Sequence, residues 1–319
     1  MAKKKVPSFI KEIQEYKPPE INYAIDKMIS YSQVSMFSSC PKKWDLMYKQ
    51  GYGRKLPTSN IHTCFGDAIH EAIQTYLNTM YNESIVKADE LDIVEIFKNK
   101  LTSRYKEVLK KEYKGTHFSS ATELREFYED GKAILEWFKK KKGKYFSKRN
   151  TILVGVEIPV FIELKKNKNV KFKGFLDLVF YHTNTEEYTI IDIKTSTKGW
   201  MDYQKKDIKK TSQLILYKDF FSKQYNIDPK KIKVEYFIVK RKLWEESDFV
   251  QNRVQSFIPP SGKNKTTLAN NLIEEFLDKA FNPDGSYKDI DHEPKPSKWD
   301  CTFCAFKDDE KLCGLGKLF

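Results

Sequence analysis

Residues 174–194 read GFLDLVFYHTNTEEYTIIDIK, and this stretch decides the fold. Two apolar runs flank the polar segment 182–187, which is the composition expected where a chain turns back. The pattern predicts a β-hairpin whose second strand ends on Asp192-Ile193-Lys194. Because side chains alternate along a strand, Asp192 and Lys194 share one face, about 7 Å apart, and Ile193 points to the other.

Ionisable groups gather at the end of this hairpin. Asp177 lies in the first strand, and a hairpin of this length can bring it beside Asp192. Two carboxylates and an ammonium group are costly to bury unless they serve a metal or each other. Metal-assisted phosphodiester cleavage needs such a set: oxygen ligands for Mg²⁺ or Mn²⁺, and a cation near the developing charge. For the tripeptide alone, an ion pair at a strand end is the alternative.

Working outward, the hydrophobic period divides the chain. Alternating apolar residues predict a half-buried strand over 151–162, in which Glu157 is out of phase with its apolar neighbours. From residue 31 to about residue 145 the period is helical, including a run from Phe65 to Met80. The other predicted elements are helices over about 88–113, from Ser120 (a capping box with Glu123), near 208–224 and over 266–281, and strands over about 170–181, 188–194 and 233–239.

These elements predict an α/β fold in which a mixed sheet is flanked by helices. Residues 1–30 are predicted to form a loosely held lead-in, and residues 31–319 a single domain. The domain divides into a helical part (31–150), a catalytic sheet core (151–260) and a C-terminal helix with a cysteine-rich, loop-like tail (261–319).

The charge balance favours an anionic polymer as partner. The formal net charge is +13 and the isoelectric point is near 9.2. Lysine richness can also reflect codon bias, because only six of the 57 basic residues are Arg. Between Lys139 and Arg149, seven of eleven residues are basic and two are aromatic, which suits phosphates and stacked bases. A solvated helix end is the competing interpretation of that run.

Apolar runs of the length needed to span a bilayer are absent from the sequence, which predicts no membrane association. The basic N-terminus is followed by neither an apolar segment nor a small-residue cleavage site. We therefore expect the protein to stay in the cytoplasm, or on the nucleoid, where it is made.

Five segments resemble, in order, those of PD-(D/E)XK nucleases, and specifically of RecB-like and AddAB-like nuclease domains. The resemblance implies a restriction-endonuclease-like core and spans residues 31–217. The five segments are Tyr31-Ser32 through Cys40-Pro41, Gly66-Asp67-Ala68-Ile69-His70, Val156-Glu157, Gly174-Phe175-Leu176-Asp177 with Asp192-Ile193-Lys194, and Gln213-x-x-x-Tyr217.

The resemblance also implies roles for single residues. His70, Asp177 and Asp192 would be metal ligands, helped by the carbonyl group of Ile193. Lys194 would position the nucleophile or stabilise charge in the transition state. The remaining site residues are the strand acid Glu157 and the helix pair Gln213 and Tyr217, which would contact nucleic acid or brace the lysine. Taken singly, His70 could be a core histidine, Glu157 a surface acid, and the helix pair ordinary packing.

The cysteines form a separate set. Five cysteines, unevenly placed and without a signal peptide, argue against a disulfide framework. Cys301, Cys304 and Cys313 are close in sequence, and Cys40 would be the fourth ligand of a metal group. The arrangement resembles the iron–sulfur branch of this nuclease family, which binds a [4Fe–4S] cluster, and zinc is the alternative. The gap of eight residues before Cys313 is longer than that branch often has. Cys64 is predicted to be a packed thiol.

Together these features predict a Mg²⁺- or Mn²⁺-dependent DNA nuclease that degrades DNA from its ends during recombination, repair or processing. A structure-selective endonuclease on the same fold is one alternative. A non-catalytic nucleic-acid-binding protein that carries a metal cluster is the other. No phosphate-binding loop of the form G-x-x-x-x-G-K-[ST] occurs, so a partner helicase or recombination protein would have to supply any motor activity.

Overall fold

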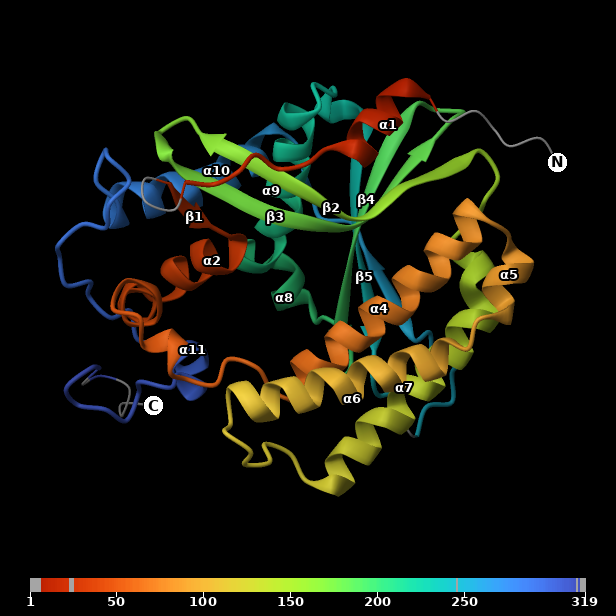
Figure 1. The fold of residues 1–319 in the computed structure, drawn as a ribbon, viewed down its shortest axis with the longest axis horizontal. Helices are drawn as coiled ribbons and strands as arrows, with labels where there is room; N and C mark the ends of the chain where they lie inside the picture. The colour runs from red at the N-terminus through yellow and green to blue at the C-terminus, as the bar shows by residue number, and fades with distance from the viewer. Residues whose placement is uncertain (1–6, 23–25, 245, 314, 316–319) are drawn as a thin grey trace.

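A six-stranded mixed sheet forms the centre of the molecule (Figure 1). The computed structural model describes residues 7–22, 26–244, 246–313 and 315. The sheet order is β1-β3-β4-β5-β6, and β2 pairs with the free side of β3. The strands are β1 (Lys27–Ile29), β2 (Thr151–Leu164), β3 (Asn167–His182), β4 (Glu187–Ser196), β5 (Ile232–Lys240) and β6 (Val254–Phe257).

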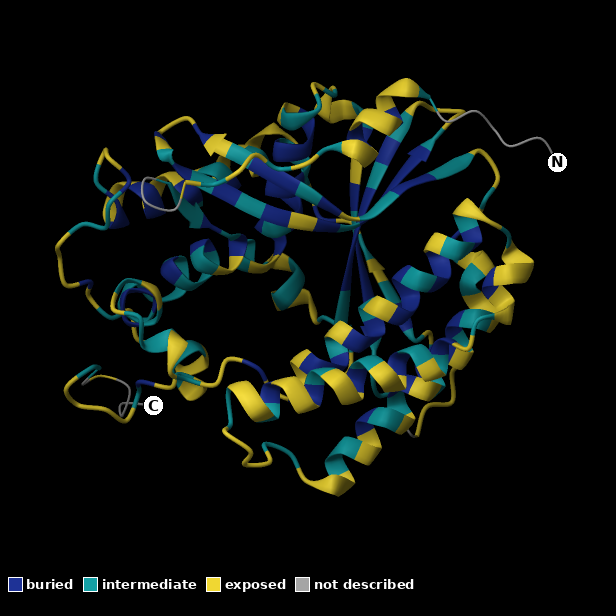
Figure 2. Cartoon of the chain, in the orientation of Figure 1, coloured by how far each residue is buried: buried dark blue, intermediate teal, exposed yellow. Residues whose placement is uncertain are grey.

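Helices cover both faces of this sheet, as the α/β prediction required (Figures 1 and 2). One face packs on α4, α6 and α7, and the other on α1, α2, α9 and α10. The main helices are α1 (Ser8–Glu15), α2 (Tyr31–Ser39), α4 (Ile61–Asn82), α6 (Ile93–Lys111), α7 (Ala121–Lys141), α9 (Ile208–Gln224) and α10 (Lys263–Ala280). The short helices are α3 (Pro41–Trp44), α5 (Ile85–Glu90), α8 (Asp202–Lys206) and α11 (Lys298–Thr302), with π or 3₁₀ turns at Asp45–Lys49, Tyr52–Arg54, Lys142–Lys144 and Pro229–Lys231.

Local signals in the sequence set the ends of several helices. The side chain of Ser120 accepts a hydrogen bond from the amide of Glu123, so α7 begins where its capping residue predicted. Asp207 caps α9 in the same way through the amide of Lys209. The helix predicted over 88–113 is divided at Asp92. The Asp92 side chain accepts hydrogen bonds from two backbone amides, and α6 begins directly after it. A separate helix, α5, precedes it.

The interpretation of residues 1–30 as a loosely held lead-in is wrong for its described part. Helix α1 lies against β2 and buries Ile10 and Ile13 completely or nearly so. Just beyond, β1 adds a parallel strand to β3. Both elements are short, and their apolar positions are too few to show a period, so neither could be predicted from the sequence. Residues 1–6 and 23–25 lie outside the described residues.

The tail returns to the N-terminal helices. His292 packs its ring against Phe37 and Trp44, and the amide of Lys295 donates a hydrogen bond to the sulfur of Cys40 at 3.5 Å. Two elements were not predicted from the sequence. Helix α11 lies in the tail, which was predicted to be loop-like, and β6 is a further strand of the sheet. Among the described residues, none of the helices is both long enough and apolar enough to cross a bilayer.

Candidate active site and metal centre

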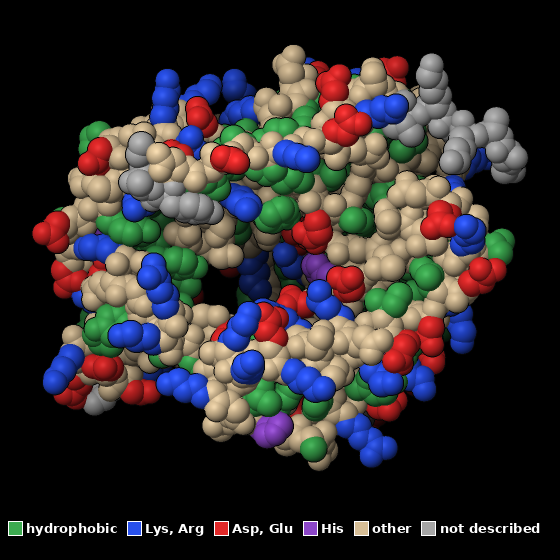
Figure 3. Space-filling view, viewed as in Figure 1, with side chains coloured by type: hydrophobic (Ala, Val, Ile, Leu, Met, Phe, Trp, Pro, Cys, Tyr) green, Lys and Arg blue, Asp and Glu red, His purple; other side chains and the backbone are tan. Residues whose placement is uncertain are grey.

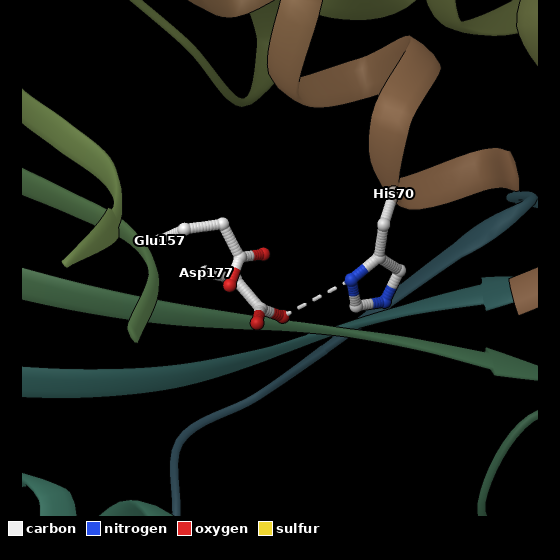
Figure 4. Close-up of side chains that lie close together, drawn as sticks. All are labelled: His70, Glu157 and Asp177. Atoms are coloured by element: carbon white, nitrogen blue, oxygen red, sulfur yellow. Dashed lines mark ion pairs between the residues drawn. The ribbon is translucent and has the colours of Figure 1, made fainter. Parts of the chain in front are cut away.

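Three potential metal ligands from three different elements converge between the sheet and α4 (Figure 4). His70 comes from α4, Glu157 from β2 and Asp177 from β3, and one ligand atom of each lies within 4.8 Å of the others. His70 Nδ1 is 3.6 Å from Asp177 Oδ2. One imidazole nitrogen and two carboxylates form a donor set that fits a divalent ion such as Mn²⁺ or Mg²⁺.

A break in the sheet ladder creates this position. Strands β3 and β4 pair only as far as Leu178 and Ile191, and they separate beyond that point. The amide of Ile193 therefore lacks a strand partner and donates instead to Asp177 Oδ2 at 2.7 Å. The hairpin thus places Asp177 at the opening between the two strands, with one carboxylate oxygen fixed by the neighbouring strand.

Asp192 and Lys194 lie on β4 directly behind this opening. Lys194 Nζ is 2.8 Å from Asp192 Oδ2, and the Asp192 side chain is 4% exposed. Asp192 lies outside the group of three ligands but interacts electrostatically with Asp177 and His70. The shared face that alternation predicted for Asp192 and Lys194 is therefore present, and the pair reaches the edge of the candidate metal centre.

Burial controls the protonation of the site. Desolvation, opposed by Lys194, raises the pKa of Asp177 to about 6, and desolvation likewise raises that of Asp192 to about 6. Burial lowers the pKa of His70, and the Lys194 ammonium lowers it further, which keeps the imidazole neutral and able to bind a metal. Burial also disfavours the charged form of Lys194, but the Asp192 and Asp177 carboxylates outweigh it and raise the pKa of the lysine.

Glu157 reaches the site through an unusual backbone conformation. Its φ is +50°, in the left-handed region that side chains other than glycine rarely adopt within a strand. The pairs formed by Val156 and Ile158 with β3 flank it on both sides. The side chain of Gln74 donates to Glu157 Oε1 at 2.8 Å. Gln74 is a site residue that was not predicted from the sequence, although its place one helical turn after His70 on the same face is a signal that could have found it.

The helix pair also lies at the site. Gln213 Nε2 donates to the hydroxyl group of Tyr217 at 3.3 Å on α9. Tyr217 is 6% exposed, and it interacts electrostatically with Asp192 and Lys194. A Cβ atom added at Gly174 would come within 2.8 Å of the Tyr217 ring, so the glycine leaves room for the tyrosine beside the lysine. The Ile193 backbone lies within hydrogen-bonding reach of His70.

The four predicted cluster cysteines meet in one place. They line a single pocket between the α2–α3 junction and α11, together with Lys43. Electrostatic interaction joins Cys304 to Cys313 and Cys40, and burial raises the pKa of the Cys304 thiol. Cys64 is fully buried on α4, away from this pocket, as expected of a packed thiol. Three thiols from the tail and the thiol of Cys40 are thus brought together across the chain.

The basic run from Lys139 to Arg149 supports the structural interpretation better than the base-stacking one. Phe146 is 5% exposed and packs on Phe138, Phe180 and Phe237. Lys142 forms an ion pair with Asp89 at 2.7 Å. The run therefore consists of the last turn of α7, the 3₁₀ turn after it and a segment whose Phe146 packs in the core. Around the hollow at the centre of the face shown in Figure 3, acidic and basic side chains gather instead.

A comparison with protein families gives a match over most of the chain. The family model described as the PD-(D/E)XK nuclease superfamily matches residues 28–308, which is most of the chain. A search of curated proteins found no relative. The matched range includes every residue of the candidate metal centre, the pair on β4, the helix pair, and three of the four clustered cysteines; only Cys313 lies beyond it.

Proposed function

The chain belongs to the PD-(D/E)XK nuclease superfamily, and from that premise we propose that it is a metal-dependent DNA nuclease, acting from DNA ends. Nucleases of this superfamily are hydrolases that act on nucleic acids and typically use Mg²⁺ or Mn²⁺. The observation that carries the proposal is the convergence of His70, Glu157 and Asp177 beside the ion pair of Lys194 with the buried Asp192.

We propose that His70, Glu157 and Asp177 hold the ion, with Asp192 and the Ile193 carbonyl group completing its surroundings. When bound, the ion supplies Lewis-acid stabilisation of the scissile phosphate. The hydrogen bond from the Ile193 amide fixes the Asp177 carboxylate before an ion binds. The raised pKa of Asp177 means that its charged form is destabilised by burial and would be stabilised by a nearby cation. A bound cation would offset the desolvation cost of the Asp177 and Asp192 carboxylates, which are the two that burial affects.

Lys194 has the role of stabilising negative charge on the phosphate and orienting the attacking water. Asp192 holds the ammonium group at 2.8 Å, and Tyr217 packs beside it, so the lysine is ordered before substrate arrives. Preorganised charge of this kind is worth about 3 kcal/mol or more of transition-state stabilisation in comparable sites. Gln213 supports the tyrosine hydroxyl and, through it, the lysine.

DNA as the substrate and cleavage from ends are supported by the net charge and by the shape of the molecule. The charge of +13 favours a polyanion. The space-filling view shows a hollow bordered on one side by α4 and α6 and on the other by the α2 and α8 side (Figure 3). A strand that enters such a hollow reaches the metal centre most easily through a free end.

The test uses end-labelled linear DNA and covalently closed circular DNA, incubated with Mn²⁺ and wild-type protein or Asp192→Ala. We expect the wild type to degrade linear DNA and spare the circles, and the variant to cleave neither. Rapid nicking of circles would replace the end-dependent proposal with a structure-selective endonuclease. Undiminished turnover by Asp192→Ala would overturn the mechanism, and RNA degradation in place of DNA would overturn the substrate.

We further propose that Cys40, Cys301, Cys304 and Cys313 bind a [4Fe–4S] cluster, which places the chain in the RecB-like branch with such a cluster. Their common pocket supports this proposal. The arrangement of one early cysteine and three in the tail favours iron–sulfur over zinc, because the ligands of structural zinc sites usually come as two close pairs.

Such a cluster would join the tail to the N-terminal helices and have a structural role. Under this proposal residues 31–319 act as one nuclease domain, and the contacts of Lys295 and His292 with the α2–α3 region support it. A separate helicase or recombination protein would supply DNA with free ends. Anaerobic purification tests the cluster: we expect iron and acid-labile sulfide in equal amounts, and stoichiometric zinc without iron would replace the cluster with a zinc site.

A further inference from the structure

We propose that Gln74 is a positioning residue that sets the affinity of the metal centre by holding Glu157, in a strained backbone conformation, toward His70 and Asp177. The inference rests on the proposed metal-dependent function and goes beyond it. It gives a role to a buried amide that the chemistry itself does not use, and to a strained residue that lies between two regular β2–β3 pairs.

Gln74 ties two of the three ligands together. It lies one helical turn beyond His70 on α4, and it is 8% exposed. Its Nε2 atom donates to Glu157 Oε1 at 2.8 Å and to the backbone carbonyl oxygen of Asp177 at 3.2 Å. Both amide hydrogens are therefore used, and a single side chain fixes a carboxylate on β2 relative to the backbone of β3.

The backbone of Glu157 needs such support. A φ of +50° brings the Cβ of any residue other than glycine close to the following carbonyl group, which costs free energy. Conformations of this kind persist only where the surroundings hold them, and they cluster at functional sites. Here the regular pairs Val156–Leu178 and Ile158–Leu176 hold the strand on both sides, and Gln74 holds the side chain.

An amide suits this role better than a charged partner would. A lysine at this position would neutralise Glu157 and compete with the ion for its oxygens. The neutral amide of Gln74 donates one hydrogen bond to Oε1 and leaves the charge and the second oxygen available. Because the Glu157 side chain is otherwise exposed, fixing it before the ion binds removes an entropic cost from binding.

The test measures Mn²⁺ affinity by titration calorimetry on the intact protein without DNA. Gln74→Met keeps length and removes the donor, and we expect it to weaken Mn²⁺ binding 10- to 100-fold, as the loss of a ligand's hydrogen-bond partner does at other metal sites. The matched control is Asn78→Ala, one further turn along the same helix, where the side chain is exposed and bonded to Asn82. It should bind Mn²⁺ as the wild type does.

A double-mutant cycle separates positioning from a general effect on the fold. If Gln74 acts through Glu157, Gln74→Met should weaken Mn²⁺ binding no further in a Glu157→Ala background. An equal loss of Mn²⁺ affinity in both backgrounds, or no loss in the Gln74→Met single variant, would overturn the inference. The nuclease proposal would still stand if the wild type cleaves DNA. A wild type that binds no Mn²⁺ would overturn the proposed function itself.

The strain has its own readout, which needs no metal. Glycine adopts positive φ freely, whereas in a regular strand it is less stable than alanine. We therefore expect Glu157→Gly to melt at a higher temperature than Glu157→Ala in the presence of a chelator. The reverse order would show that residue 157 is unstrained in solution and would remove the strained strand from the proposal.

Discussion

Replacing Asp177 by Asn should inactivate the enzyme and yet stabilise its metal-free form. The Asp177 carboxyl group is 13% exposed, and burial raises its pKa from 3.8 to about 6. A folded-state pKa above the unfolded one means that the fold favours the protonated acid. Stability is therefore lost as pH rises from the unfolded value to about 6, and the loss is complete above that pH.

The size of the effect follows from the pKa difference. The shift from 3.8 to about 6 corresponds to roughly 3 kcal/mol at pH 8 and to roughly 1 kcal/mol at pH 4.5. Asn cannot ionise, and its amide oxygen can still accept the hydrogen bond from the Ile193 amide. Asp177→Asn should thus recover most of this free energy, with a gain over the wild type that shrinks as the pH falls.

The assay is urea unfolding followed by circular dichroism, with a chelator, at pH 8 and at pH 4.5. Mn²⁺ at about 100 times its dissociation constant should then stabilise the wild type by about 2.7 kcal/mol at pH 8 and the variant much less. Asp202→Asn is the control, because that side chain is 86% exposed and lies outside the candidate metal centre. Equal stability of Asp177→Asn and wild type at pH 8, or an unchanged response to Mn²⁺, would refute the reasoning.

Three further substitutions test the rest of the site. His70→Ala should raise the Mn²⁺ concentration needed for half-maximal cleavage at least tenfold, with little change in melting temperature. A large fall in melting temperature with an unchanged metal response would show that His70 is a core histidine. Gly174→Ala should cost about 1–3 kcal/mol of stability in denaturant titrations and lower kcat, because the added Cβ meets the Tyr217 ring; wild-type kcat would show that the tyrosine is not needed beside Lys194. Cys301→Ser should bleach the visible absorption of the anaerobic protein and lower its melting temperature, and an equal loss of absorption in Cys64→Ser would contradict the assignment of ligands.

Alternation and helical period, both local properties, determined most of the fold in advance. The strands over 151–162, 170–181, 188–194 and 233–239 and the helix over 208–224 are present close to their predicted bounds. The shared face of Asp192 and Lys194 also follows from alternation within one strand. The order of the five motif segments along the chain was enough to predict the PD-(D/E)XK superfamily, and the family model confirms that superfamily.

Tertiary structure decided the rest, because the deciding contacts join residues far apart in the chain. Strand β1 is three residues long and exists only because β3 offers it an edge. The separation of β3 and β4 opens the ladder at Asp177, and no local pattern encodes where two strands part. Glu157 enters the ligand group through a left-handed backbone, and Gln74 reaches it across 83 residues. Sequence alone thus determined which chemical groups the protein has, and three-dimensional packing determined which of them meet at the candidate metal centre, because that depends on distances that sequence separation does not fix.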